Sequence, residues 1–360
     1  MRHKYYESSN IRYEMTLREA GMPVIFACSK KWLDMTRILL CVFALCHMAL
    51  MLHARGRDTG RTPAVTDSLA NDFRSVVSRN FSRYRTVNMS WEMKAAHNYT
   101  FTTDGKEMEK GRKQNLHTLR FSTMIPVLRQ RRLSLYANVQ YAGHVLDCAG
   151  KSSAIFSEHS YSHYSGGISA SYLAELFNRP LILSADISAD GWDGGWGMLQ
   201  GRFVAALVFS KGRNTGLTLG IAGMTLGRIP VLPVIAYRHS FHNPDWSVDI
   251  SLPSQFYLRN QRGCRRISIG GNMSGENFYL RTSLPGVPSV CYYSEVVLKT
   301  EVMYEYIINR HFYISARAGL STVIKGALYT KGRKELDAET EQKRSPMPFF
   351  NAGISYSLFK

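Results

Sequence analysis

The sequence has no uninterrupted apolar run long enough to form a transmembrane helix. The run at residues 38–52 comprises 15 residues and contains His47, whereas a helix that crosses a membrane needs about 18 or more apolar residues. A helical inner-membrane protein is therefore excluded. Apolar residues still make up 45% of the 360-residue chain, so they are spread over short segments, as in strands that present only alternate residues to lipid.

Cysteine is scarce, and neither cysteine nor histidine has the spacing of a metal site. No two of the six cysteines show C-x-x-C spacing. Those after the apolar run allow at most one disulfide, because they are odd in number and far apart: Cys148, Cys264 and Cys291. Two histidine pairs are interpreted as loop residues, because no nearby carboxylate completes a site: His159 with His163 and His239 with His242. The sequence predicts no metal, no cofactor and no catalytic residue.

Acidic residues are few relative to basic ones. The chain has 27 Asp and Glu against 45 Lys and Arg, a formal net charge of +18. These basic residues are scattered through strand-like segments and loops, without the basic helix or zinc-finger spacing of a nucleic-acid-binding protein, so no nucleic-acid partner is expected. Basic loops would suit the phosphate groups of lipopolysaccharide and other outer-membrane lipids instead.

The apolar run has the features of an export signal. A short positive segment precedes it, and small residues follow up to Gly56, after which cleavage is expected. Residues 35–56 are therefore predicted to be a signal peptide, and residues 1–34 a mis-called N-terminal extension. Residues 57–116 are interpreted as a periplasmic lead-in with room for one strand.

Residues 117–360 consist of short alternating segments separated by turn residues, without a helical period. The last segment is apolar on one face and small or polar on the other, which suits a wall between lipid and a wet interior. Its residues match the C-terminal signal by which bacterial outer-membrane barrels are recognised for insertion: Asn351, Gly353, Tyr356, Leu358 and Phe359.

The clearest hairpin lies at residues 292–324, where one face of each arm is apolar and the other charged. A Lys or Arg facing lipid at mid-depth would cost about 2–4 kcal/mol, so the charged face must line the interior. Alternation in both arms demands an odd-numbered loop, placed at residues 308–310, which brings Glu301 opposite Arg317. Six inward charges are predicted: Lys299, Glu301, Glu305, Arg317, Asp249 and Arg259.

A Gly/Trp-rich segment carries three aspartates whose spacing fails the pattern of a calcium loop: Asp186, Asp190 and Asp193. We interpret this segment as a turn at a membrane interface, with an inward, ligand-holding loop as the alternative.

These patterns predict an all-β fold: a closed, antiparallel, up-and-down transmembrane β-barrel of about 12 strands, with 14 as the alternative. The long charged connection 325–347 is expected to be extracellular. Counting back from it places the long segment 143–165 on the periplasmic side, unless the strand count is off by one.

Residues 117–360 resemble an uncharacterised family of outer-membrane β-barrels from Bacteroidota-type bacteria. The resemblance rests on four segments: Phe121–Pro126, Ile229–Tyr237, Ser247–Pro253 and Pro348–Asn351. It implies a barrel in the bacterial outer membrane and brings no ligand-binding residues with it.

The function predicted is non-enzymatic: a narrow pore for small solutes or apolar compounds, or a closed structural barrel. Insertion would require the barrel-assembly machinery. Two alternatives are a barrel that hydrolyses lipids and a soluble periplasmic β-sandwich that binds a partner.

Overall fold

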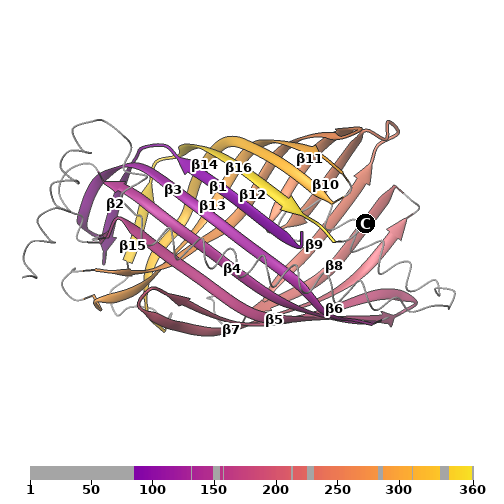
Figure 1. Cartoon of the computed structure of the whole chain (residues 1–360), viewed down its shortest axis with the longest axis horizontal. Helices are drawn as coiled ribbons and strands as arrows, with labels where there is room; N and C mark the ends of the chain where they lie inside the picture. Colours follow the sequence, from indigo (N-terminus) through magenta and orange to yellow (C-terminus); the bar gives the residue numbers. More distant parts are fainter. Residues whose placement is uncertain are drawn as a thin grey trace, which may run out of the picture. The chain divides into compact units, whose positions relative to one another are not determined.

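The protein is described by a computed structural model, which places residues 85–130, 132–148, 155–156, 158–211, 214–224, 231–282, 287–309, 311–332 and 340–358 (Figure 1). All of them belong to the second of two compact units, Pro63–Lys360, which is considered by itself. The predicted extension 1–34, the predicted signal peptide 35–56 and Phe359 lie outside the described residues. Within these ranges no helix is long and apolar enough to cross a membrane.

The described residues form sixteen β-strands. They are β1 (Val87–Lys94), β2 (His97–Thr103), β3 (Lys106–Arg129), β4 (Leu133–Cys148), β5 (Ser160–Leu176), β6 (Arg179–Trp192), β7 (Gly195–Lys211), β8 (Thr215–Met224), β9 (Val231–Ser240), β10 (Trp246–Leu252), β11 (Gln255–Arg262), β12 (Arg265–Arg281), β13 (Val290–Ile307), β14 (Phe312–Thr330), β15 (Thr340–Arg344) and β16 (Met347–Tyr356).

The sheet closes on itself, because β1 pairs with β3 on one side and with β16 on the other. From β3 to β14 every strand pairs antiparallel with the next in sequence. The strands cross the barrel wall obliquely (Figure 1), as closure of a sheet requires. The predicted closed, antiparallel, up-and-down barrel is confirmed.

The first and last strands of the wall are each interrupted once. β1 and β2 are separated by residues 95–96, and β15 and β16 by residues 345–346. The pairs Lys94–Phe349 and Tyr99–Arg344 belong to one continuous register, and prolines at 346 and 348 lack the N–H that a ladder needs. β1 with β2 therefore counts as one interrupted strand, and β15 with β16 as another. The barrel has fourteen strands around its circumference, which is the alternative number predicted from the sequence.

Two strand boundaries differ from those that the alternating segments of the sequence suggest. A turn at Gly275 would divide one strand into two, yet β12 runs through Gly275 and pairs with β13 over its full 17 residues. The wall also begins at Val87, so the boundary placed at residue 117 lies too late in the chain, and residues 87–116 are wall rather than periplasmic lead-in.

With fourteen strands, the connections 149–159 and 331–339 lie at the same end of the barrel, which we call the long-loop end. The opposite end, where β16 finishes, carries turns such as the one at Phe177–Asn178, and we call it the short-turn end. Both turn residues have positive φ, as in the type I′ turns that suit the twist of a hairpin. A turn at Gly275 would reverse the side of every connection before it, which is why the sequence placed segment 143–165 at the opposite end from 325–347.

The hairpin β13–β14 has the odd loop that alternation demanded. Ile307 pairs with Tyr313, and the backbone N–H of Ile308 donates to the carbonyl of Phe312. The register therefore differs by two residues from the predicted one. The predicted inward charges of both arms keep their face up to a β-bulge between Val296 and Val297, beyond which Lys325, expected to face inward, pairs with the exposed Val296 on the outer face.

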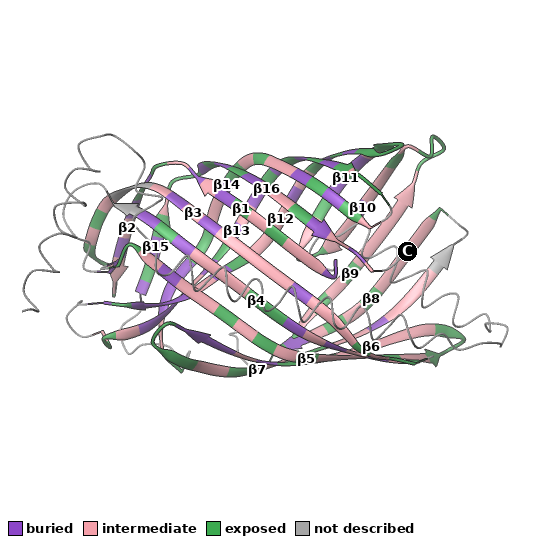
Figure 2. Ribbon diagram, in the orientation of Figure 1, coloured by how far each residue is buried: buried purple, intermediate pink, exposed green. Residues whose placement is uncertain are grey.

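Burial is inverted relative to a water-soluble protein (Figure 2). Exposed and buried residues alternate along the strands, and the exposed ones include large apolar side chains such as Ile354, Ile269 and Val302. Buried positions are rich in charged residues. In water such an exterior would be an aggregation surface, whereas hydrocarbon would cover it, so the wall has the character of a transmembrane barrel.

The wall has one weak seam, between β14 and β15. In the sheet order of the described strands β15 is placed beside β2 alone. Towards β14, the Thr340 side chain substitutes for a ladder pair: its Oγ1 accepts from the N–H of Leu328 (3.0 Å) and donates to the Leu328 carbonyl (3.2 Å).

Thr340→Val keeps the side-chain shape and removes both hydrogen bonds. We expect a loss of about 1–3 kcal/mol in the free energy of unfolding, because two buried backbone groups lose their partner. Urea unfolding of the lipid-reconstituted barrel measures the loss, and amide exchange at Leu328 localises it. Thr102→Val is the control, since the exposed Thr102 hydroxyl makes only a 3.4 Å bond to the Glu341 carbonyl. Equal stability of the two variants would contradict a role for Thr340 in this seam.

Candidate functional site: the barrel interior

All six predicted inward charges lie on the inner face of the wall. Five of them are at most 5% exposed: Asp249, Arg259, Lys299, Glu301 and Glu305. Arg317 is the exception, with 21% of its side chain exposed.

The expected ion pair between Glu301 and Arg317 is present, with 3.6 Å between Oε1 and Nη1. It runs diagonally, because Glu301 pairs directly with Gly319. A side chain at Gly319 would collide with the backbone of Thr300, so the direct partner of Glu301 is a residue without a side chain. The hydroxyl of Tyr257 also donates to Glu301 (2.5 Å).

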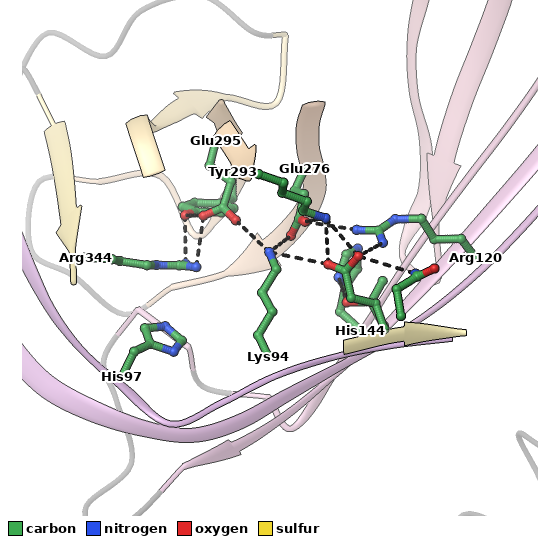
Figure 3. Close-up of polar contacts among 12 residues, drawn as sticks. Lys94, His97, Arg120, His144, Glu276, Tyr293, Glu295 and Arg344 are labelled. Carbon is green, nitrogen blue, oxygen red and sulfur yellow. Dashed lines mark hydrogen bonds and ion pairs between the residues drawn. The ribbon is translucent and has the colours of Figure 1, made fainter. Parts of the chain in front are cut away.

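Seven charged residues from five strands meet inside the barrel, and we call them the cross-barrel ion cluster (Figure 3). They are Glu92 and Lys94 on β1, Arg120 on β3, Glu276 on β12, Glu295 and Lys299 on β13, and Arg344 on β15. The side chain of Arg120 is 30% exposed, and the other six side chains are at most 7% exposed. Four cations and three carboxylates leave the cluster close to neutral, which is the condition for keeping so many charges away from bulk water.

Lys94 and Glu276 make the shortest contact of the cluster. The Lys94 Nζ lies 2.6 Å from Glu276 Oε2 and 3.7 Å from Glu295 Oε1. Glu276 also receives Arg120 at 3.1 Å and Lys299 at 3.4 Å. Since β16, β14 and β13 lie between β1 and β12 in the wall, the contact joins strands that are not neighbours and crosses the interior.

A second set of ion pairs lies toward the short-turn end. Glu305 accepts from Arg85 at 2.6 Å and from Arg266 at 3.2 Å. Asp249 lies 3.0 Å from Arg259. Like the cross-barrel ion cluster, these ion pairs place buried charged side chains on the inner side of β10–β14.

Apolar side chains fill the interior at the long-loop end, and we call them the aromatic plug. Its members come from β2, β3, β4, β5, β12, β13, β14 and the β4–β5 connection: Tyr99, Phe101, Leu116, Leu146, Ile155, Phe156, Tyr161, Phe278, Leu280, Cys291, Tyr293 and Leu328. Tyr161 stacks on Phe278 with 5.1 Å between ring centroids, although β5 and β12 are not neighbours in the wall. The plug therefore joins opposite walls.

Part of the Gly/Trp-rich segment points inward, whereas its Trp196 is 76% exposed. Asp190 is 1% exposed and accepts from the backbone N–H of Met198 (2.6 Å) and the hydroxyl of Tyr279 (3.1 Å). Trp192 is buried against Tyr279. These two residues point inward, as in the alternative interpretation, and Asp190 acts as a joint between β6, β7 and β12.

Two of the histidines interpreted as loop residues lie on strands instead. His163 belongs to β5 and His239 to β9. His163 lies 3.2 Å from Asp190, and the ring of His239 stacks on that of Tyr237. In the described residues no group of three or more His, Cys, Asp or Glu could hold a metal ion.

The inner face of β7–β9 is small and apolar. Three rows of paired residues cross it: Val204–Ala222–Leu232, Ala206–Gly220–Val234 and Val208–Thr218–Ala236. Arg202 and Asp186, which pair at 2.9 Å, share this face, and the opposite face presents lipid-side residues such as Phe203 and Ile221. Most of the nine residues are half-buried, so solvent reaches this wall. We call it the apolar inner wall.

The described residues of the C-terminal signal keep the predicted faces. Asn351 and Gly353 face inward, and the amide of Asn351 donates to Glu92 (3.4 Å). The rings of Tyr356 and Phe312 pack on the outer face, 4.8 Å apart. Leu358 lies just past the end of β16, where its N–H donates to Thr86.

Sequence reasoning missed most of the cross-barrel ion cluster. Glu92 and Lys94 lay in the assumed lead-in, and Arg344 lay in the assumed loop. The signal for β1 was present, because apolar residues at 87, 89, 91 and 93 alternate with polar ones.

Comparison with known proteins gives a weak likeness to outer-membrane barrels. No family model and no curated protein matches the chain. Among solved structures, an outer membrane channel from Pseudomonas putida F1 is 10% identical, with 76% of this chain and 96% of that one covered and a TM-score of 0.33. A FadL homologue from Pseudomonas aeruginosa is 10% identical, covers 75% and 90%, and also scores 0.33. The outer membrane protease OmpT from Escherichia coli is 9% identical, covers 75% and 96%, and scores 0.26. Such values decide no activity, and the barrel stands on its own strand pairing.

Glu276→Gln removes the carboxylate that receives three cations. We expect a loss of about 3–5 kcal/mol in the free energy of unfolding, the usual cost of breaking a buried ion pair from one side. Urea unfolding and the temperature of the heat-modifiable gel shift measure it. Glu341→Gln is the control, because the exposed pair of Glu341 with Lys343 is worth about 0–1 kcal/mol. If both variants unfold alike, the cluster does not support the barrel.

Proposed function

We propose that this chain is a non-enzymatic barrel of the bacterial outer membrane that gives slow passage to small and apolar compounds. The observation that carries the proposal is the divided interior: ion pairs and aromatic rings fill the side formed by β1–β3 and β11–β16, while β7–β9 present a solvent-reached wall of small apolar residues. Barrel diameter grows with strand number, so fourteen strands enclose more width than the about eight strands whose interior side chains alone can fill.

The membrane assignment is supported by the apolar exterior and by the C-terminal strand. The long-loop end would face outward, as long loops do in such barrels. Lipid and lipopolysaccharide would then be its surroundings, and insertion would use the barrel-assembly machinery through the signal that includes Asn351, Gly353 and Tyr356. Membership of the Bacteroidota-type family suggested by the sequence belongs to this proposal.

The aromatic plug explains why passage would be slow. It lies at the long-loop end and includes Phe156, which is 3% exposed and packs against Tyr161 and Tyr293. A solute would have to displace rings held by edge-to-face contacts, each worth about 0.5–1.5 kcal/mol beyond area burial.

A lipid-hydrolase activity has no comparable support. In the described part of the chain, the acid–histidine pair on the inner wall is Asp190 with His163, 3.2 Å apart. Asp190 also accepts from Met198, Gln200 and Tyr279, so its carboxylate is committed to joining strands rather than to orienting a catalytic histidine.

The double variant Phe156→Ala/Tyr161→Ala tests the proposed passage. We expect single-channel conductance in planar bilayers to rise clearly above that of the unmodified barrel, because two rings of the barrier are removed. Entry of the apolar dye N-phenylnaphthylamine into cells that carry the variant should rise as well. Heat-modifiable gel mobility checks that the barrel is folded.

Phe203→Ala is the matched control, since it removes a ring from the lipid side of the wall and should leave both readings unchanged. Dye entry equal to that of cells without the barrel, for the unmodified protein and the double variant alike, would contradict a passage and leave a closed structural barrel.

A further inference from the structure

The apolar inner wall is flanked by an arginine at each end. Arg202 lies on β7, one inward position before Val204, and Arg238 lies on β9, one inward position after Ala236. Because β7 and β9 both run from the long-loop end to the short-turn end, the two guanidinium groups lie on opposite sides of the apolar rows. The rows span roughly four residues of β7, or about 13 Å of strand.

Both arginines present their charge to solvent while their acidic partners are more deeply buried. The Arg202 side chain is 51% exposed and that of Asp186, its partner at 2.9 Å, is 17% exposed. The Arg238 side chain is 39% exposed and lies 3.8 Å from Asp249, which is 3% exposed. Each carboxylate therefore contacts its arginine from the buried side, and the guanidinium group remains accessible to solvent.

Each of the two carboxylates has partners other than the exposed arginine. Asp186 accepts from Ser169 (2.7 Å) and Asn138 (2.8 Å) as well as from Arg202. Asp249 lies 3.0 Å from the buried Arg259 in addition to Arg238. An incoming anion would therefore not need to strip Arg202 or Arg238 from a carboxylate that depends on it alone.

We propose that the apolar inner wall with Arg202 and Arg238 binds small amphipathic organic anions, in which a carboxylate or similar group is joined to an apolar body of about six carbons. The anionic group pairs with a guanidinium, which offers several N–H donors in a plane, and the body lies along the aliphatic rows. A second arginine at the far end can receive the anion as it leaves the first. The inference names the solute class for the passage proposed above and rests on that proposal for the route.

Equilibrium dialysis of the barrel in nanodiscs of uncharged lipid, with empty nanodiscs as blank, tests the site. The probes are hexanoate, its neutral counterpart hexanamide, the cation hexylammonium and the tail-less acetate. We expect hexanoate to bind about tenfold or more tighter than each of the other three, since only hexanoate uses both parts of the site; tenfold corresponds to about 1.4 kcal/mol.

Variants separate the two parts of the site. Arg202→Gln/Arg238→Gln should weaken hexanoate binding about tenfold and leave hexanamide binding unchanged, whereas Val234→Asn should weaken both. Arg262→Gln is the control, because Arg262 is 73% exposed in its side chain and pairs with Asp245 near a turn. Heat-modifiable mobility checks the fold of every variant.

Two results would overturn the site: hexanamide binding as tightly as hexanoate, or Arg262→Gln weakening hexanoate binding as much as the double variant does. Failure of the passage can be told apart from failure of the site. Selective hexanoate binding without dye entry would support the site and contradict the passage, and dye entry without hexanoate preference would do the reverse.

Discussion

The contact between Lys94 and Glu276 is the interaction on which the rest of the interior depends. It joins the first strand of the wall to a strand that is separated from it by three others. Above it, at the long-loop end, β1 gives way to β2 and β16 to β15, so the wall loses its regular ladder just where the cluster is densest. The ion pairs inside the barrel join β1 to β12, and so compensate for the ladder that is interrupted near Pro346 and Pro348. The aromatic plug directly contacts the cross-barrel ion cluster, because the hydroxyl of Tyr293, a plug residue, accepts a hydrogen bond from Arg344.

The requirement to neutralise buried charge makes the interior asymmetric. Each buried carboxylate needs cations or donors around it, so acidic and basic side chains gather where strands approach closely enough to share them. The side formed by β1–β3 and β11–β16 meets this condition. Between Arg202 and Arg238 the inward side chains of β7–β9 are short and uncharged, mostly alanine, valine and glycine. The interior therefore has one buried ionic side and one solvent-reached aliphatic side, and this asymmetry is a consequence of packing.

The sequence predicted the face of most side chains in its clearest strands, and much less about what they touch. Period-two alternation assigned the inner face to Glu301, Glu305 and Lys299, and the structure places them there. Alternation carries no information on partners across a lumen, so a contact such as that of Lys299 with Glu92 at 2.7 Å could not be predicted. The strand boundary at Gly275 was wrong, because a glycine inside a ladder and a glycine at a turn look alike in sequence. The aromatic plug was missed for a related reason: an inward tyrosine and a lipid-facing tyrosine obey the same alternation.

The break in the first and last strands gives the two ends of the wall different attachments. On the short-turn side of the break, β1 is held by eight consecutive pairs to β16 and eight to β3. On the long-loop side, β2 and β15 share five pairs, and β15 meets β14 through the hydroxyl of Thr340. Loss of pairing around β15 therefore does not require the main ladder to open, because the regular pairing is already interrupted at residues 345–346. The plug residues Tyr99 and Phe101 lie on β2, so part of the aromatic plug belongs to the more weakly attached part of the wall. The apolar inner wall, by contrast, belongs to continuous strands.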